Sequence, residues 1–274
     1  MPELYNERFP KFRPLIPFIK FTEKISQRFA DFVIVANHLW LERLVKRNRL
    51  DPERATAILN YPNLSFYKTS QSKHQNSVLN LVYPGHLSYH HGIDIAIKGF
   101  AIIAKEIPEA KFNIYARTFV QHYREELITL IKELFLQDSV ILHGALLPEQ
   151  LNCVYENSTI GIVPKRAGQF TSEAFSSKIF DFFAAGVPVV LSKTTVDEYY
   201  FDQNCVSFFE PGNYNDLADK VIQLYRNKEE MSRLIANGKK YVQENCWEVK
   251  RANYYSIINF LNGKTTIDVG IDAI

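Results

Sequence analysis

With 274 residues, 46% of them hydrophobic, the chain is long enough to bury a core as one large domain or two smaller ones. Its 32 basic and 30 acidic residues almost cancel, so nothing in the composition points to a nucleic-acid surface. The three cysteines, Cys153, Cys205 and Cys246, fit neither a disulfide framework nor a metal-ligand cluster. No apolar run reaches the roughly 18 residues of a membrane helix, and the N-terminus has no signal-peptide core. We therefore expect a globular, cytoplasmic protein.

The first 70 residues predict only a few elements. Residues 11–29 interleave bases with large apolar side chains and predict a helix. This helix either lies on an anionic membrane, as a peripheral contact, or docks on the protein with a solvated basic face. A strand over 31–37, a short helix over 39–49 and a strand over 55–63 follow. These pieces are too few for a second doubly wound domain, which needs about 100 residues, so we interpret 1–70 as a domain remnant with its linker.

After a polar stretch, apolar runs rich in β-branched residues alternate with segments of helical spacing. This alternation predicts an α/β domain, a Rossmann-like doubly wound parallel sheet, over residues 71–262, with a tail over 263–274. The last 60 residues predict helices. The predicted strands are 78–84, 111–117, 139–145, a run around 161, 187–192 and 206–211, and the clearest crossover helices are 92–108 and 123–135.

Ligands of open parallel sheets bind at the carboxyl ends of the strands, where loops lead into helix N-termini. The loops 84–92, 116–119, 143–148 and 164–178 should meet at this edge. Several of them are rich in glycine, serine, histidine and bases, which suit a phosphorylated ligand.

Two acids, Glu173 and Asp181, stand about 10 Å apart if a helix begins between them near Ser176. That distance is too long for a shared proton, and glycoside hydrolysis is poorly suggested. The pair is better suited to bind the two hydroxyl-bearing ends of a long ligand, such as a sugar and a ribose joined by a diphosphate. Backbone amides between the acids would face the diphosphate, with Lys178 and nearby bases supplying charge.

The spacing of these acids, together with the turn that follows them, resembles a family signature. That signature is an acid, seven residues, a second acid, a small residue, glycine, any residue, proline and two β-branched residues. The chain is therefore similar to the retaining GT-B glycosyltransferases of family 4, over roughly residues 30–261. The similarity is to the C-terminal donor-binding domain with a truncated N-terminal domain, and to a bacterial branch associated with surface or exopolysaccharide assembly. The matching residues are Glu173, Asp181, Ala185, Gly186, Pro188, Val189 and Val190.

The resemblance implies a role for each matching position. Glu173 would bind hydroxyls of the donor sugar, Asp181 those of the ribose, and Lys178 would join Glu173 in catalysis. Gly85 would let the first loop approach the diphosphate. The full set of donor-binding residues predicted is Gly85, His86, Ser88, His90, His91, Arg117, Leu146, Lys165, Arg166, Phe175, Ser176, Ser177 and Asp181.

Three departures from the family pattern bear on these roles. Asp181 replaces the usual Glu and is one methylene shorter. His86 and His91 stand where the family commonly has Arg and Lys, and we expect both to be partly charged near neutral pH. The N-terminal acceptor domain is largely absent. No metal site is predicted, because the histidines near residue 90 have no cysteine or acid at ligand spacing.

The leading hypothesis is a metal-independent, retaining glycosyltransferase. It would move a sugar from a UDP-, GDP- or other nucleoside diphosphate donor to a glycan or lipid-linked acceptor, without a further cofactor. Either a separate chain supplies the missing acceptor domain, or the chain is an inactive fragment. Two alternatives stay open, namely a non-catalytic nucleotide-sugar-binding module and a nucleotide-sugar epimerase of the GT-B architecture.

Overall fold

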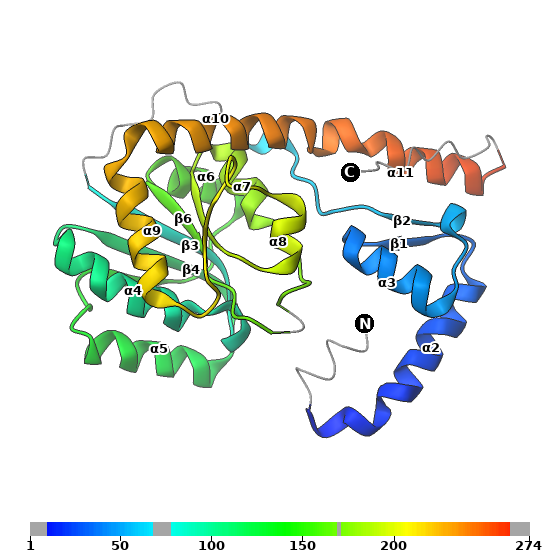
Figure 1. Cartoon of the computed structure of the whole chain (residues 1–274), viewed down its shortest axis with the longest axis horizontal. Helices are drawn as coiled ribbons and strands as arrows, with labels where there is room; N and C mark the ends of the chain where they lie inside the picture. The colour runs from blue at the N-terminus through cyan, green and yellow to red at the C-terminus, as the bar shows by residue number, and fades with distance from the viewer. Residues whose placement is uncertain (1–9, 68–77, 169–170, 264–274) are drawn as a thin grey trace.

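A parallel sheet of six strands forms the centre of the larger part of the molecule (Figure 1). The computed structural model describes residues 10–67, 78–168 and 171–263. The strands lie in the order β5-β4-β3-β6-β7-β8, and every neighbouring pair is parallel. This order is that of a doubly wound fold and confirms the predicted fold class. The strands are β3 (Asn80–Leu87), β4 (Lys111–Phe119), β5 (Val140–His143), β6 (Ile160–Val163), β7 (Val189–Ser192) and β8 (Ser207–Phe209).

Helices cover both faces of this sheet, which explains why its central strands are apolar throughout. Every residue of β6 and β7 is buried, as expected for parallel strands packed on two sides. One face packs against α4 (Ile93–Glu106), α5 (Gln121–Glu133) and α9 (Tyr214–Arg226). The other packs against α6 (Pro148–Glu156), α7 (Lys178–Ala185), α8 (Thr195–Tyr200) and α10 (Lys228–Glu244).

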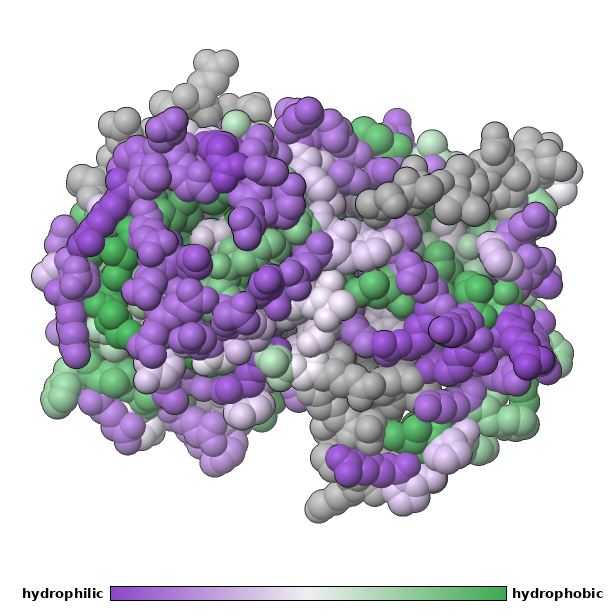
Figure 2. Space-filling model, viewed as in Figure 1, coloured by the Kyte–Doolittle hydropathy of each residue, from purple (hydrophilic) through white to green (hydrophobic). Residues whose placement is uncertain are grey.

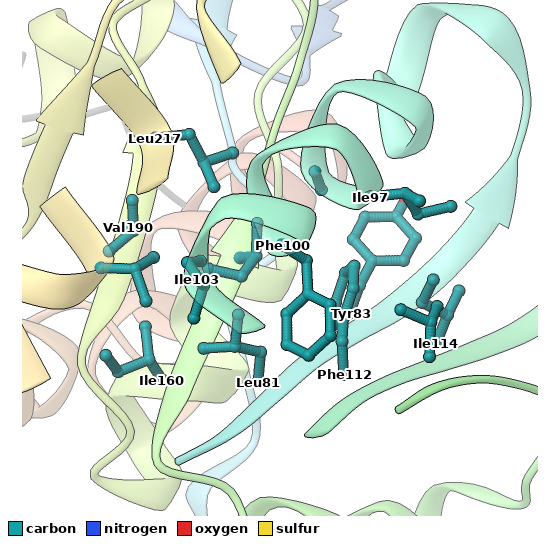
Figure 3. Close-up of a cluster of buried hydrophobic side chains, with 14 of the residues drawn as sticks. Leu81, Tyr83, Ile97, Phe100, Ile103, Phe112, Ile114, Ile160, Val190 and Leu217 are labelled. Atoms are coloured by element: carbon teal, nitrogen blue, oxygen red, sulfur yellow. The ribbon is translucent and has the colours of Figure 1, made fainter. Parts of the chain in front are cut away.

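The first of these layers holds a close-packed apolar core (Figure 3). The rings of Phe100 on α4 and Phe112 on β4 lie 5.8 Å apart and are both fully buried. Leu217 of α9 reaches the same cluster from the neighbouring helix. Burial of each such side chain contributes about 1.5 to 3 kcal/mol, so this layer fixes the loops that leave β3 and β4.

The N-terminal unit is one β-α-β arrangement. Strands β1 (Val33–Val35) and β2 (Ala55–Ala57) pair in parallel, and α3 (His38–Asn48) connects them. The side chain of Asn37 caps α3 by accepting from the amide of Trp40 at 2.9 Å. Trp40 and Leu44 bury against Val35. The remaining elements here are η1 (Pro10–Leu15), α2 (Ile16–Phe29), η2 (Pro52–Arg54) and η3 (Leu64–Phe66).

The C-terminal helix α11 (Trp247–Leu261) returns from the six-stranded sheet toward the N-terminal unit, continuing the line of α10 (Figure 1). The amide of Trp247 donates to the carbonyl of Pro62 at 2.9 Å, and the amide of Leu64 donates to Glu248 at 3.4 Å. The terminal helix therefore ties the two parts together.

The structure differs from the sequence expectations in a few elements. The strand expected over 55–63 ends at Ala57, before Asn60 and the proline at 62. Neither α6 nor α8 was predicted. The expected boundary near residue 70 and almost all of the tail, 263–274, lie outside the described residues. Within the described ranges, no helix has both the length and the apolar character needed to cross a membrane.

Gly92 connects the loop after β3 to α4 and allows a stability test. Its φ is +65°, and a Cβ there would lie 1.9 Å from the carbonyl oxygen of Pro164. We expect Gly92→Ala to lower the free energy of unfolding by about 3 kcal/mol, through backbone strain and steric overlap. In urea denaturation the matched control is Gly144→Ala, whose Cβ would meet nothing within 4 Å. Similar midpoints for both variants would contradict this packing.

Candidate functional site

The strand order reverses between β3 and β6, and a cavity of about 720 Å³ opens beyond the carboxyl ends of these strands. Such a reversal is the usual ligand site of an open α/β sheet, because adjacent loops diverge there. Three segments line the cavity: the loop after β3, the start of α5, and the loop from β6 into α7. Its lining includes the predicted residues His86, Ser88, His90, His91, Lys165, Phe175, Ser176, Ser177 and Lys178.

The end of β3 and the loop after it approach α7 closely because residue 85 is glycine. A Cβ on Gly85 would lie 2.9 Å from the hydroxyl of Tyr83 and 3.2 Å from Cε of Lys178. The glycine therefore makes room for the lysine side chain at the cavity wall. Its predicted approach to a diphosphate stays a prediction.

The histidines of this loop are held by hydroxyl groups. His86 Nδ1 lies 2.6 Å from the hydroxyl of Thr118, and His91 Nδ1 lies 2.8 Å from that of Ser88. Burial, assisted by the Lys178 ammonium and the neighbouring histidines, lowers the pKa of His91 to about 3. His91 is therefore neutral at physiological pH, and the expectation that it is partly charged is wrong, because the sequence pattern does not reveal its burial.

Lys178 is the first residue of α7, and its ammonium lies in the cavity wall. Nζ is 3.3 Å from the hydroxyl of Ser176 and 5.0 Å from the ring centroid of Tyr83. Burial and then the nearby Lys165 ammonium lower the pKa of Lys178 to about 8, against the opposing effect of Asp181 and Asp197. The cation is thus poorly solvated and lies at the N-terminus of a helix, whose dipole favours an anionic ligand.

Lys165 forms a buried ion pair with Asp197 of α8. Their atoms lie 2.5 Å apart, and the side chains are 6% and 0% exposed. Lys165 also donates to the carbonyl of Ala174 at 3.1 Å, while Asp197 accepts from Thr194 at 2.5 Å. Burial lowers the pKa of Lys165 and raises that of Asp197, and their mutual attraction opposes both shifts. The pair holds the loop that leads into α7.

Arg166, the neighbouring base, is directed away from the cavity. Its guanidinium pairs with Asp94 of α4, donates to the carbonyl of Tyr89 at 3.0 Å and lies 3.9 Å above the Tyr89 ring. In addition, the amide of Arg166 donates to the carbonyl of His90 at 3.3 Å. These contacts join the loops after β3 and β6. A donor-binding role for Arg166 stays a prediction, because its guanidinium contacts Asp94 and Tyr89 and does not line the cavity.

Glu173 belongs to the contact between the two parts of the molecule. Its carboxylate forms a two-pronged ion pair with Arg43 of α3, in which Nη1 donates at 2.6 Å. Its carbonyl accepts from Asn37 at 3.0 Å and from the Trp40 indole at 3.2 Å. Glu173 borders a separate cavity of about 410 Å³, which it shares with α3 and Thr195. To bind a sugar hydroxyl, the carboxylate would have to share or exchange its arginine partner.

Asp181 also contacts the N-terminal unit. The hydroxyl of Tyr67 donates to Oδ1 of Asp181 at 2.6 Å. Burial raises the pKa of Asp181, and this hydrogen bond opposes the shift. Neither Glu173 nor Asp181 lines the 720 Å³ cavity. The expected arrangement, with both acids turned toward one ligand, is therefore not the one this structure displays, and their ligand roles stay predictions.

The other predicted residues occupy varied positions. Leu146 is half-buried in the loop after β5, and the cavity lining described above does not include it. Arg117 belongs to β4, but its side chain lies outside what the structure describes. The ring of Phe175 packs on Phe180 and Tyr200, at 5.1 and 5.0 Å. It thus anchors the loop as well as lining the cavity.

Sequence reasoning missed several residues around the cavity. Asp197 carried no sequence signal, because its partner Lys165 lies 32 positions away in the chain. His122 and Glu126 form a 3.0 Å pair on α5 and also line the cavity. Because α5 follows β4, its first residues lie at the carboxyl edge of the sheet, and this placement could have identified both residues from the sequence. In the described residues, no cluster of three or more His, Cys, Asp or Glu is arranged to hold a metal ion.

Comparison with known proteins assigns the family. Residues 68–241 match the family described as "Glycosyl transferases group 1", and the chain belongs to that family. The phosphatidylinositol N-acetylglucosaminyltransferase gpi3 subunit of Schizosaccharomyces pombe is 24% identical over 202 residues. That match covers 72% of this chain but only 41% of the relative, so the chain spans less than half of that protein's length.

Solved structures share the fold at low identity. Sucrose-phosphate synthase from Thermosynechococcus elongatus has a TM-score of 0.76 at 20% identity, covering 90% of this chain and 62% of its own. A Rickettsia africae glycosyltransferase has a TM-score of 0.74 at 13% identity, covering 86% and 64%. Anabaena Alr3699/HepE, solved with UDP and glucose, has a TM-score of 0.71 at 19% identity, covering 85% and 64%. These similarities establish that the chain shares the fold of GT-B glycosyltransferases.

The Lys165–Asp197 pair generates a stability prediction. Asp197→Asn leaves a buried ammonium without its carboxylate, so we expect the free energy of unfolding to fall by about 3 to 5 kcal/mol. The control is Glu106→Gln, which removes the exposed pair with Arg226 and should cost below about 1 kcal/mol. Chemical denaturation at neutral pH measures both. Equal losses in the two variants would contradict a structural role for the buried pair.

Proposed function

We propose that this chain is the donor-binding half of a nucleotide-sugar glycosyltransferase. The observation that carries the proposal is the cavity at the reversal of strand order, with the Lys178 ammonium and the start of α7 in its wall. A diphosphate placed there would meet the cation and the N-terminus of α7 together. Family membership supports the same reading.

The chemistry suits these groups. In sugar transfer, the bond between the anomeric carbon and a phosphate oxygen breaks while an acceptor oxygen bonds to that carbon. The leaving nucleoside diphosphate gains negative charge, and the acceptor proton passes to it or to solvent. Lys178 and the α7 amides would stabilise this charge, which is electrostatic catalysis directed at a leaving group. Glu173 would orient the sugar hydroxyls.

The finer assignments are also proposals. The Anabaena structure contains UDP and glucose, which favours a UDP-hexose among the candidate donors. The yeast relative is named for transfer to phosphatidylinositol, which favours a lipid-linked acceptor over a free glycan. Retention of anomeric configuration, independence from metal and a role in surface polysaccharide synthesis follow from the resemblance to family 4. We propose a cytoplasmic location for this reaction.

The name of the yeast relative favours a second candidate, a donor-binding subunit of a larger enzyme. In the described residues, the sheet on this side has two strands, β1 and β2. The chain covers 62 to 64% of the three solved proteins above, and the yeast relative is itself called a subunit. In that case the chain alone binds the donor, and diphosphate release requires an added acceptor-side partner.

Calorimetry with UDP-glucose and GDP-mannose tests donor binding directly. Because the pKa of Lys178 lies near 8, its ammonium loses the proton as pH rises from about 7 to about 9, and affinity for the diphosphate should fall over that range. Lys178→Gln should weaken binding about tenfold or more at neutral pH and remove most of this pH dependence.

Lys111→Gln is the matched control, since Lys111 is exposed at the opposite end of β4 and donates to the carbonyl of Asp138. It should leave affinity unchanged at every pH. Failure of the native chain to bind any nucleotide sugar would contradict the proposed function. Donor binding that is equally strong in Lys178→Gln would place the diphosphate elsewhere.

Glu173 provides a separate test of sugar recognition. If its carboxylate contacts the sugar, Glu173→Gln should weaken the binding of UDP-glucose by about tenfold and leave the binding of UDP almost unchanged. Thermal unfolding of the same variant measures any loss of stability caused by breaking the ion pair with Arg43. Equal weakening of UDP and UDP-glucose would assign Glu173 to the structure of the loop and not to the sugar.

A further inference from the structure

Helix α2 exposes an apolar stripe. Phe18, Phe21, Ile25 and Phe29 are 64%, 59%, 38% and 85% exposed, and none of the residues of α2 is buried. Their spacing of three and four residues places them on one face of the helix. Single exposed apolar residues are ordinary, but a continuous stripe of this kind marks an interaction surface.

The orientation of α2 is fixed by polar contacts on its inner side. Glu23 pairs with Arg47 of α3, and the side-chain amide of Asn48 donates to Gln27 at 2.5 Å and to Glu23 at 3.3 Å. A helix that packs on its own domain normally turns its apolar face inward. Here the arrangement is reversed, so the apolar stripe faces out of the described structure.

Bases accompany the stripe. At 100° per residue, Arg28 and then Lys24 flank the apolar arc beside Phe21, while Lys20 lies farther round toward the inner side. Arg13 lies in the turn just before α2. The acid of this helix, Glu23, is on the inner side and already paired with Arg47. Where α2 lies at the lower right of Figure 1, the space-filling view shows apolar and strongly hydrophilic residues side by side (Figure 2).

We propose that α2 lies flat on an anionic lipid surface. The three phenylalanines would enter the boundary between headgroups and acyl chains, about 5 to 10 Å deep. The flanking bases would meet lipid phosphates, each strengthening binding about fivefold. The proposal goes beyond donor binding and does not depend on it, since attachment to lipid needs no nucleotide. It would also bring the cavity to the surface that carries a lipid-linked acceptor.

A protein partner is the competing occupant of this face. An apolar protein surface would cover the phenylalanines but leave Lys24 and Arg28 at its rim. An anionic bilayer accounts for the apolar stripe and the row of bases together, and Phe with Lys and Arg is the composition of interfacial helices. Charge complementarity therefore favours lipid.

Flotation of the full chain with vesicles tests the proposal. Vesicles of equal parts phosphatidylcholine and phosphatidylglycerol should carry the chain upward, and vesicles of phosphatidylcholine alone should carry little. Phe21→Ser with Phe29→Ser should abolish flotation, and Arg28→Glu should reduce the bound fraction about fivefold or more. High salt should weaken binding of the native chain.

The matched controls are Phe135→Ser, an 88% exposed phenylalanine beyond α5, and Lys240→Glu on the exposed side of α10. Both should float like the native chain. Because Phe21 and Phe29 are exposed, their variants should keep native thermal unfolding and UDP-glucose affinity, which separates this test from that of donor binding. No flotation with anionic vesicles, or undiminished flotation of the double variant, overturns the proposal. Self-association that the double variant abolishes would assign the stripe to a protein interface and overturn it as well.

Discussion

The geometry of the cavity depends on the buried ion pair between Lys165, which follows β6, and Asp197 of α8. Lys165 holds the carbonyl of Ala174, and the amide of Val196 beside Asp197 donates to the carbonyl of Ser172 at 2.8 Å. The loop entering α7 is thereby fixed at both sides. An isolated buried charge is strongly unfavourable, so neither partner is stable there without the other. Because Lys178 follows this loop as the first residue of α7, the ion pair also determines the position of Lys178.

The balance of charge in the cavity follows from the same burial. Asp197 attracts both Lys165 and Lys178, yet desolvation still lowers the pKa values of both ammonium groups. His91 remains neutral for the same reason and adds no competing charge. A diphosphate entering the cavity would supply the negative charge that Lys178 lacks, and by linkage it would raise the pKa of that lysine. The poorly solvated ammonium of Lys178 and the negatively charged leaving group proposed here are therefore complementary in charge.

Local sequence patterns predicted the fold well, because strands and helices of an α/β domain carry their own periodicity. The run 187–192 predicted β7, and the stripe of Ile93, Ile97 and Phe100 predicted the buried face of α4. Long-range pairing was not predictable in this way. Periodicity gives the face of an element but not its partner, so Arg43 beside Glu173 and Tyr67 beside Asp181 carried no sequence signal.

The residues of the candidate site were also predicted only in part. The prediction was incomplete for the same reason, because sequence patterns do not reveal long-range partners. The rule for strand ends identified the loops that form the cavity, including His86, His90 and Lys178. The side chains of the two signature acids, Glu173 and Asp181, turn toward the N-terminal unit, so their ligand roles stay predictions. The structure thus separates the groups that line the cavity from those that join the two parts of the molecule.

The most direct test of the central claim is a crystal structure of this chain with UDP. The account predicts that the diphosphate lies within hydrogen-bonding distance of Lys178 Nζ and of the first amides of α7. A diphosphate bound outside the cavity between the ends of β3 and β6, with Lys178 making no contact to it, would contradict the account.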